Sequence, residues 1–108
     1  MEQADRVQLE RDFHDVMLEG YRRAKAEAGY NATYFIQSVQ NRGGLATARS
    51  LLHAGRTSDG FTSLYLKQRL DLTVEALICD NPRFTPLFSE EETDIARQRL
   101  RDHGYQPR

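Results

Sequence analysis

Residues 43–52 read GGLATARSLL, and the way this stretch packs decides the fold. Gly43 is predicted to end the preceding helix, because glycine adopts the left-handed backbone that closes a helix without a side-chain penalty. Gly44 then starts the next helix almost at once, so the two helices must cross closely. The apolar residues of this next helix share one face at helical spacing: Leu45, Ala48, Leu51 and Leu52. We expect residues 44–53 to form a short helix in the centre of the core.

Two further helices are predicted before this stretch. Apolar residues recur every three or four positions over residues 5–28, which indicates one long amphipathic helix. Gly20 lies within its apolar stripe, and a glycine inside a helix costs about 1 kcal/mol relative to alanine. A close crossing by another helix is therefore expected at Gly20. Asn31 is predicted to cap a second helix, which ends at Asn41 or Arg42.

A fourth and a fifth helix are predicted in the middle of the chain. Ser58 or Asp59 can cap the fourth helix, and Asp71 can cap the fifth. Apolar residues alternate at the start of the fifth element, so a strand over residues 70–78 stays open as the alternative.

The last helix has the clearest boundaries. Ser89 and Glu92 form a capping box at its start, and Gly104 is predicted to stop it after about His103. The connector at residues 83–88 is rich in phenylalanine and is expected to lie over the core.

Length and composition fit one all-α domain. A chain of 108 residues has the size of a single domain, with an expected radius of gyration of about 13 Å. Hydrophobic residues make up 39% and charged residues 29%, as in soluble globular proteins. No apolar run could cross a bilayer and the first residues lack a signal-peptide pattern, so a cytoplasmic protein is expected. We predict a compact bundle of about six helices that forms one domain over residues 1–108.

No motif for catalysis or metal binding stands out. Cys79 is the only cysteine, which excludes an internal disulfide and predicts a small buried thiol. Glu10 and His14 share a helix face but are expected to form an exposed ion pair rather than a metal site. Asp71 and Glu75 are not expected to form a catalytic pair of carboxylates. Asp71 is expected to cap a helix, and Glu75 is expected to lie on a solvated helix face. We expect no enzyme, no cofactor and no metal, although a site formed only by folding, with a histidine beside carboxylates, stays open.

Acidic residues are absent from residues 31–58, and the basic side chains there are the candidate binding residues: Arg42, Arg49, His53 and Arg56. A solvated helix face would explain them as well. The helices on either side of Gly43 have the outline of a DNA-binding helix-turn-helix, but the residues around the glycine depart from the usual pattern. Nucleic-acid binding through this acid-free segment is therefore the alternative prediction.

A docking surface for a protein is the preferred explanation. Arginine and tyrosine are enriched at protein contacts, and several tyrosines accompany these arginines: Tyr30, Tyr34, Tyr65 and Tyr105. We therefore predict a non-enzymatic module that binds another protein and has no membrane contact.

Four motifs cover most of the chain. They are Gly29-Tyr30-x-Ala32-x-x-Phe35, Gly43-Gly44-x-x-Thr47-Ala48-x-x-Leu51-Leu52, Ser58-x-Gly60-Phe61-x-x-Leu64 and the run from Arg69 to Leu77. Together they resemble a small helical domain of bacterial hypothetical proteins that carries no assigned activity. The resemblance implies a self-contained bacterial domain and no particular mechanism.

Overall fold

The computed structural model describes residues 3–107, which form six α-helices and two short 3-10 segments. In chain order they are α1 (Gln3–Ala28), α2 (Thr33–Arg42), α3 (Gly44–Leu52), α4 (Asp59–Leu66), η1 (Leu70–Leu72), α5 (Val74–Cys79), η2 (Pro82–Leu87) and α6 (Glu90–Asp102). Within residues 3–107 there is no β-strand, so the all-α prediction is confirmed and the strand alternative is wrong.

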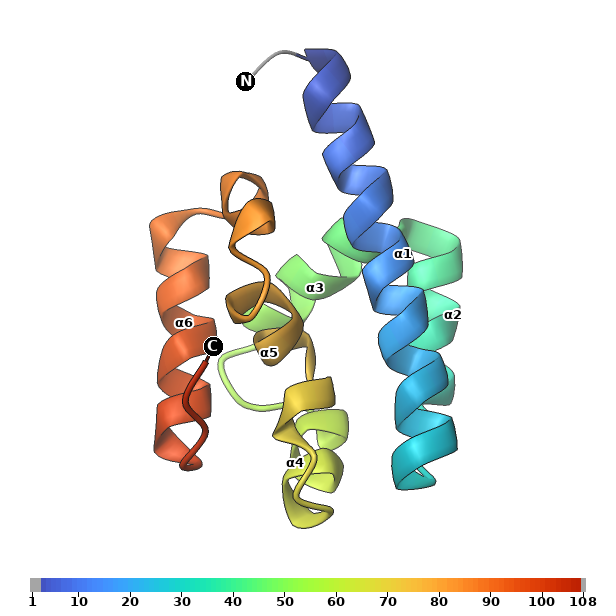
Figure 1. Cartoon of the computed structure of the whole chain (residues 1–108), viewed down its shortest axis with the longest axis vertical. Coiled ribbons are helices and arrows are strands. Elements are labelled where there is room, and N and C mark those ends of the chain that lie inside the picture. Colours follow the sequence, from blue (N-terminus) through green and yellow to red (C-terminus); the bar gives the residue numbers. More distant parts are fainter. Residues whose placement is uncertain (1–2, 108) are drawn as a thin grey trace.

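Helices α3 and α5 lie in the middle of the molecule, with α1 and α2 side by side on one flank and α6 on the other (Figure 1). The Cα radius of gyration is 13.0 Å, as expected for a compact chain of this length. Each helix of the described range is too short or too polar to cross a bilayer.

α3 starts in direct contact with the middle of α1. Gly44 is buried, and a Cβ atom placed on it would lie 2.9 Å from His14 Cα. The first N–H groups of a helix have no acceptor within that helix. The Gly44 N–H instead donates to His14 Nδ1 at 3.0 Å. Gly43, with a φ of 90°, ends α2 as predicted. Gly44 has no side chain, so α1 can pack closely against it, and the sequence did not indicate this contact.

The same contact corrects the expectation for His14. His14 is half-buried and accepts the Gly44 hydrogen bond, so the predicted exposed pair with Glu10 is wrong. Glu10 pairs with Arg6 at 3.3 Å instead.

α3 lies in the core as predicted. Ala48 and Leu52 are buried within the main hydrophobic cluster, and Leu45 and Leu51 are partly buried against it.

The main cluster joins α1 to α5 and η2. Phe13 of α1 is fully buried and packs edge-to-face against Phe84 and Phe88, with ring centroids 5.2 and 5.4 Å away. The phenylalanine-rich connector therefore covers the core, as expected. A Cβ placed on the buried Gly20 would lie 2.8 Å from Leu77 Cδ1, which confirms the close crossing predicted at this glycine.

Several helix ends follow their predicted signals. Ser58 Oγ accepts the Phe61 N–H at 3.0 Å at the start of α4, and the capping box of Ser89 and Glu92 is present at the start of α6. Gly104 has a φ of 79° just beyond the end of α6.

Two predicted caps are wrong because their side chains bind elsewhere. Asn31 Oδ1 accepts a hydrogen bond from the Tyr21 hydroxyl at 2.9 Å, and α2 begins without a side-chain cap. The Asp71 carboxylate accepts a hydrogen bond from Arg69 Nε at 3.0 Å, and Thr73 caps α5 in its place.

Replacing Gly44 with alanine is expected to lower the free energy of unfolding by about 1 to 3 kcal/mol, because the added methyl group would overlap the α1 backbone at His14. Chemical denaturation followed by circular dichroism measures the change. Gly60→Ala is the matched control, since the atom nearest to a Cβ there is the Tyr30 hydroxyl oxygen at 3.4 Å. The control should be neutral or slightly stabilising, because alanine favours a helix. Equal losses in both variants would contradict the close crossing.

Candidate binding cleft

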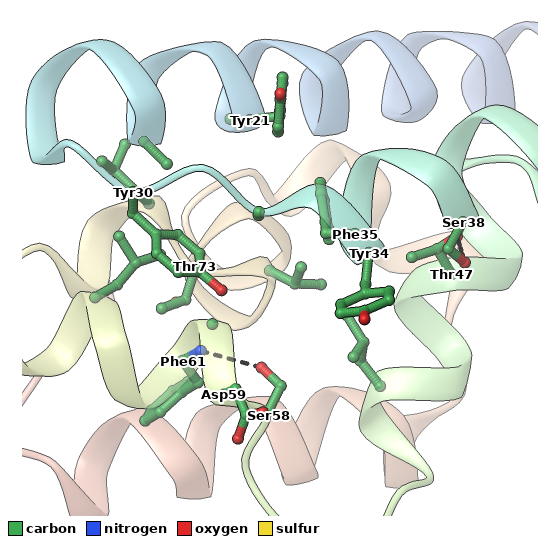
Figure 2. Close-up of a pocket in the computed structure, with 18 of the residues that line it drawn as sticks. Tyr21, Tyr30, Tyr34, Phe35, Ser38, Thr47, Ser58, Asp59, Phe61 and Thr73 are labelled. Atoms are coloured by element: carbon green, nitrogen blue, oxygen red, sulfur yellow. Dashed lines mark hydrogen bonds between the residues drawn. The ribbon is translucent and has the colours of Figure 1, made fainter.

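A cleft of about 500 Å³ lies between the α1–α2 side of the molecule and α4. Tyr30 and Tyr34 are on the α1–α2 side, and Ser58 and Asp59 face them from the start of α4 (Figure 2). Thr47 of α3 lies at one end of the cleft. η1 and α5 supply the remaining wall. Five helices and the η1 segment thus contribute to one concave surface.

The inner surface of this cleft is largely apolar. Ala24, Leu64 and Leu72 form a small buried cluster along it, and Tyr30 packs against them. An apolar concave surface with a few polar groups is typical of ligand-binding sites, and volumes of about 300 to 1,000 Å³ are usual for them.

Most polar side chains of the cleft are already hydrogen-bonded within the fold. Ser38 Oγ and Thr47 Oγ1 share a hydrogen bond of 2.8 Å, which joins α2 to α3. Arg42 Nη2 donates to Ser50 Oγ at 2.7 Å and joins the same two helices further along. These bonds hold α2 in place and so maintain the shape of the cleft.

Tyr30 and Asp59 are different, because neither side chain has a hydrogen-bond or ion-pair partner among residues 3–107. The Tyr30 hydroxyl lies over the start of α4, next to Gly60. Burial, and then the negative charge of Asp59, raise the pKa of Tyr30 above its ordinary value. The hydroxyl therefore stays protonated at neutral pH and can donate a hydrogen bond.

Tyr34 and Arg42 form the exposed rim of the cleft. Tyr34 lies in the first turn of α2 with 88% of its surface exposed, although it is a large aromatic residue. Arg42 is exposed at the last turn of α2. Exposed tyrosine and arginine beside an apolar hollow are the residue types that dominate binding energy at protein contacts.

The four candidate residues taken from the acid-free segment are not all in this cleft. Arg42 lines it, whereas Arg49 and His53 bind Glu92 of α6, at 2.9 Å from Nε and 2.7 Å from Nε2. Arg56 is exposed in the loop before α4 and forms no ion pair with any described residue. Arg49 and His53 thus have a structural role, and their role in binding stays a prediction.

Glu92 is buried although it belongs to an acidic run. Burial raises its pKa, but the hydrogen bonds from the Ser89 backbone N–H, Arg49 and His53 together outweigh burial and lower the pKa to about 2. The charged carboxylate joins α3 to α6. A histidine beside a carboxylate is what an acid–base site would need, but neither His53 nor Glu92 lines the cleft.

Glu75 also differs from its expectation. Its side chain is 3% exposed rather than solvated, and its Oε2 lies 3.2 Å from Arg99 Nη1. Burial raises the pKa of Glu75 above its ordinary value, against the effect of Arg99. Arg99 also donates to the carbonyl oxygens of Leu51 and Leu52 at 3.0 and 3.2 Å, so it caps the end of α3.

What the metal-ligating side chains and the thiol of Cys79 can do depends on their positions. Within residues 3–107, no three His, Cys, Asp or Glu side chains come together in a way that could hold a metal ion. The Cys79 thiol is half-buried, and burial raises its pKa to about 11. Cys79 is therefore protonated at neutral pH and weakly nucleophilic.

Sequence reasoning selected Tyr30, Tyr34 and Arg42 but missed the hydroxyl pair that shapes the cleft. Ser38 and Thr47 stand at inward positions of α2 and α3 where apolar residues would be usual. A polar residue at such a position signals a buried partner, although it does not say which one.

Comparisons with protein-family models, with curated proteins and with solved structures find no match to this chain. The resemblance to a bacterial helical domain therefore stays a prediction. What the cleft can bind follows from its own shape and charges.

Glu92→Gln is expected to make the free energy of unfolding less dependent on pH below about pH 4.5. The folded pKa lies below the ordinary value of 4.5, so Glu92 stabilises the fold above that value and loses its contribution as the pH falls toward 2. The half-exposed Arg49 and His53 are screened by solvent, so this contribution is roughly 1 to 2 kcal/mol. Denaturant titrations at a series of pH values measure it.

Glu91→Gln is the control for Glu92→Gln, since Glu91 is exposed in the same helical turn. Glutamine at position 92 can still complete the capping box, so the loss of charge is isolated. If the free energy of unfolding changes with pH in the same way in the wild type and in both variants, the charge of Glu92 does not stabilise the fold.

Proposed function

We propose that the protein is a non-enzymatic binding module that takes a short segment of another protein into the cleft. The observation that carries the proposal is an apolar hollow of about 500 Å³ with the exposed side chain of Tyr34 at its rim. A partner's apolar side chain would bury itself against Leu64 and Leu72, where it gains the free energy of leaving water. Tyr34 would then fold over that side chain.

The open form of the cleft favours a chain segment over an enclosed small molecule. Several residues of its lining are exposed, among them Asn31, Thr33 and Tyr34 along the start of α2. α2 has 10 residues and is therefore about 15 Å long, which matches four or five residues of extended chain.

A nucleic acid is less well supported as the partner. Arg49 and His53 share the negative charge of Glu92, so the acid-free segment presents less free positive charge than its sequence suggests. The carboxylate of Asp59 at the cleft would also repel phosphate. Retardation of DNA or RNA in a gel at low salt, lost as salt rises, would favour this alternative over the peptide.

We also propose that the module acts in the cytoplasm. Its single cysteine, Cys79, is not in a disulfide, which is typical of proteins in reducing compartments. Fractionation of cells that produce the protein would test the location.

Selection from a random peptide library displayed on phage is expected to return peptides that share an apolar residue. NMR titration of the labelled protein should place the bound peptide at the start of α2 and at Leu64. Tyr34→Ala should weaken binding about tenfold or more, because the large aromatic side chain that covers the partner's apolar residue is lost. Isothermal titration calorimetry measures the affinities.

Tyr65→Ala is the matched control for Tyr34→Ala, since Tyr65 is partly exposed on α4 but does not line the cleft. It should leave the affinity unchanged. Failure to select any peptide that shifts the resonances of the cleft would reject the proposed function.

A further inference from the structure

The cleft has an anionic end. Asp59 carries a carboxylate with no cation paired to it among residues 3–107, and it acts on Tyr30 electrostatically. The Tyr30 side chain extends from the opposite wall, and its hydroxyl lies over the start of α4 next to Gly60 (Figure 2). A carboxylate close to the Tyr30 ring suits an ammonium or guanidinium group, which can pair with the carboxylate and also lie over the ring face.

The other end of the cleft is cationic. Arg42 is the last residue of α2, twelve positions after Tyr30, and its guanidinium is held by a neutral partner, the Ser50 hydroxyl. A guanidinium has five N–H donors, so donors remain for a carboxylate.

Among the residues that the structure describes, the lining offers no other available charge. Glu75 is the remaining charged residue there, and it is buried in its ion pair with Arg99. The cleft therefore presents one negative and one positive group, separated by an apolar surface.

We infer that the partner segment carries an apolar anchor flanked by a basic residue, which binds at Asp59 and Tyr30, and by an acidic residue, which binds at Arg42. This inference rests on the proposed function and specifies the partner. The two flanking residues stand on opposite sides of the apolar anchor, because Tyr30 precedes α2 and Arg42 is the last residue of α2.

Charge reversal tests the inference. The probe is the tightest peptide from the phage selection, compared with a twin in which its basic and acidic residues are exchanged. Arg42→Glu and Asp59→Lys should each weaken binding of the selected peptide about tenfold, because an attraction becomes a repulsion. The double variant should bind the exchanged twin better than the selected peptide.

Matched controls make the same charge changes away from the cleft. Arg11→Glu and Asp15→Lys alter exposed residues of α1 outside the lining and should leave both affinities within about twofold of the wild type. Circular dichroism melting of each variant shows whether it is folded, and Arg42→Gln and Asp59→Asn replace any variant that is not.

The outcomes separate this inference from the proposed function. Unchanged affinity in both charge variants, together with weaker binding in Tyr34→Ala, would overturn the charge pattern and leave the apolar cleft as the peptide site. Failure to select a peptide that binds the cleft would overturn both. Self-association of the chain that Arg42→Glu abolishes would also overturn the inference, since a second copy would then be the occupant.

Discussion

The contact between Gly44 and His14 fixes where α3 starts against α1, and the remaining packing depends on it. Gly43 alone separates α2 from α3, so once α3 is placed, α2 must return along α1. The far end of α3 is held as well, because Arg99 of α6 donates to its last carbonyl groups. α3 therefore spans from α1 to α6, and polar side chains form hydrogen bonds with its first N–H group and its last carbonyl groups.

The cleft is a consequence of this arrangement. α2 is attached to one end of α3 and α4 follows the other end through a loop, so α2 and α4 face each other without filling the space between them. Hydroxyl contacts such as that of Ser38 with Thr47 hold α2 against α3, and they involve neither the Tyr30 hydroxyl nor the Asp59 carboxylate. Within residues 3–107 the side chains of Tyr30 and Asp59 have no hydrogen-bond or ion-pair partner, and we propose that they bind a partner segment.

The sequence predicted what depends on nearby residues. Apolar spacing, glycines and capping residues are local signals, and they predicted the helices and the Ser89 capping box, although the caps predicted at Asn31 and Asp71 are wrong. Other misreadings concern side chains whose partners are distant in sequence, such as His14, which binds a backbone N–H 30 positions away, and Glu75, which pairs with Arg99. The tyrosines of the cleft were selected as contact residues, but a hollow shared by several helices depends on their mutual packing and leaves no local pattern.

Hydrogen exchange at the Gly44 amide tests the central contact most directly. Initial N–H groups of a helix normally exchange with solvent readily, because they lack an acceptor, as does the first N–H of α4 at Asp59 within the described chain. If His14 Nδ1 accepts the Gly44 N–H inside the α1–α3 contact, exchange at Gly44 should be slow and comparable to that of core amides such as Ala48. Exchange at Gly44 as fast as at Asp59 would contradict the account.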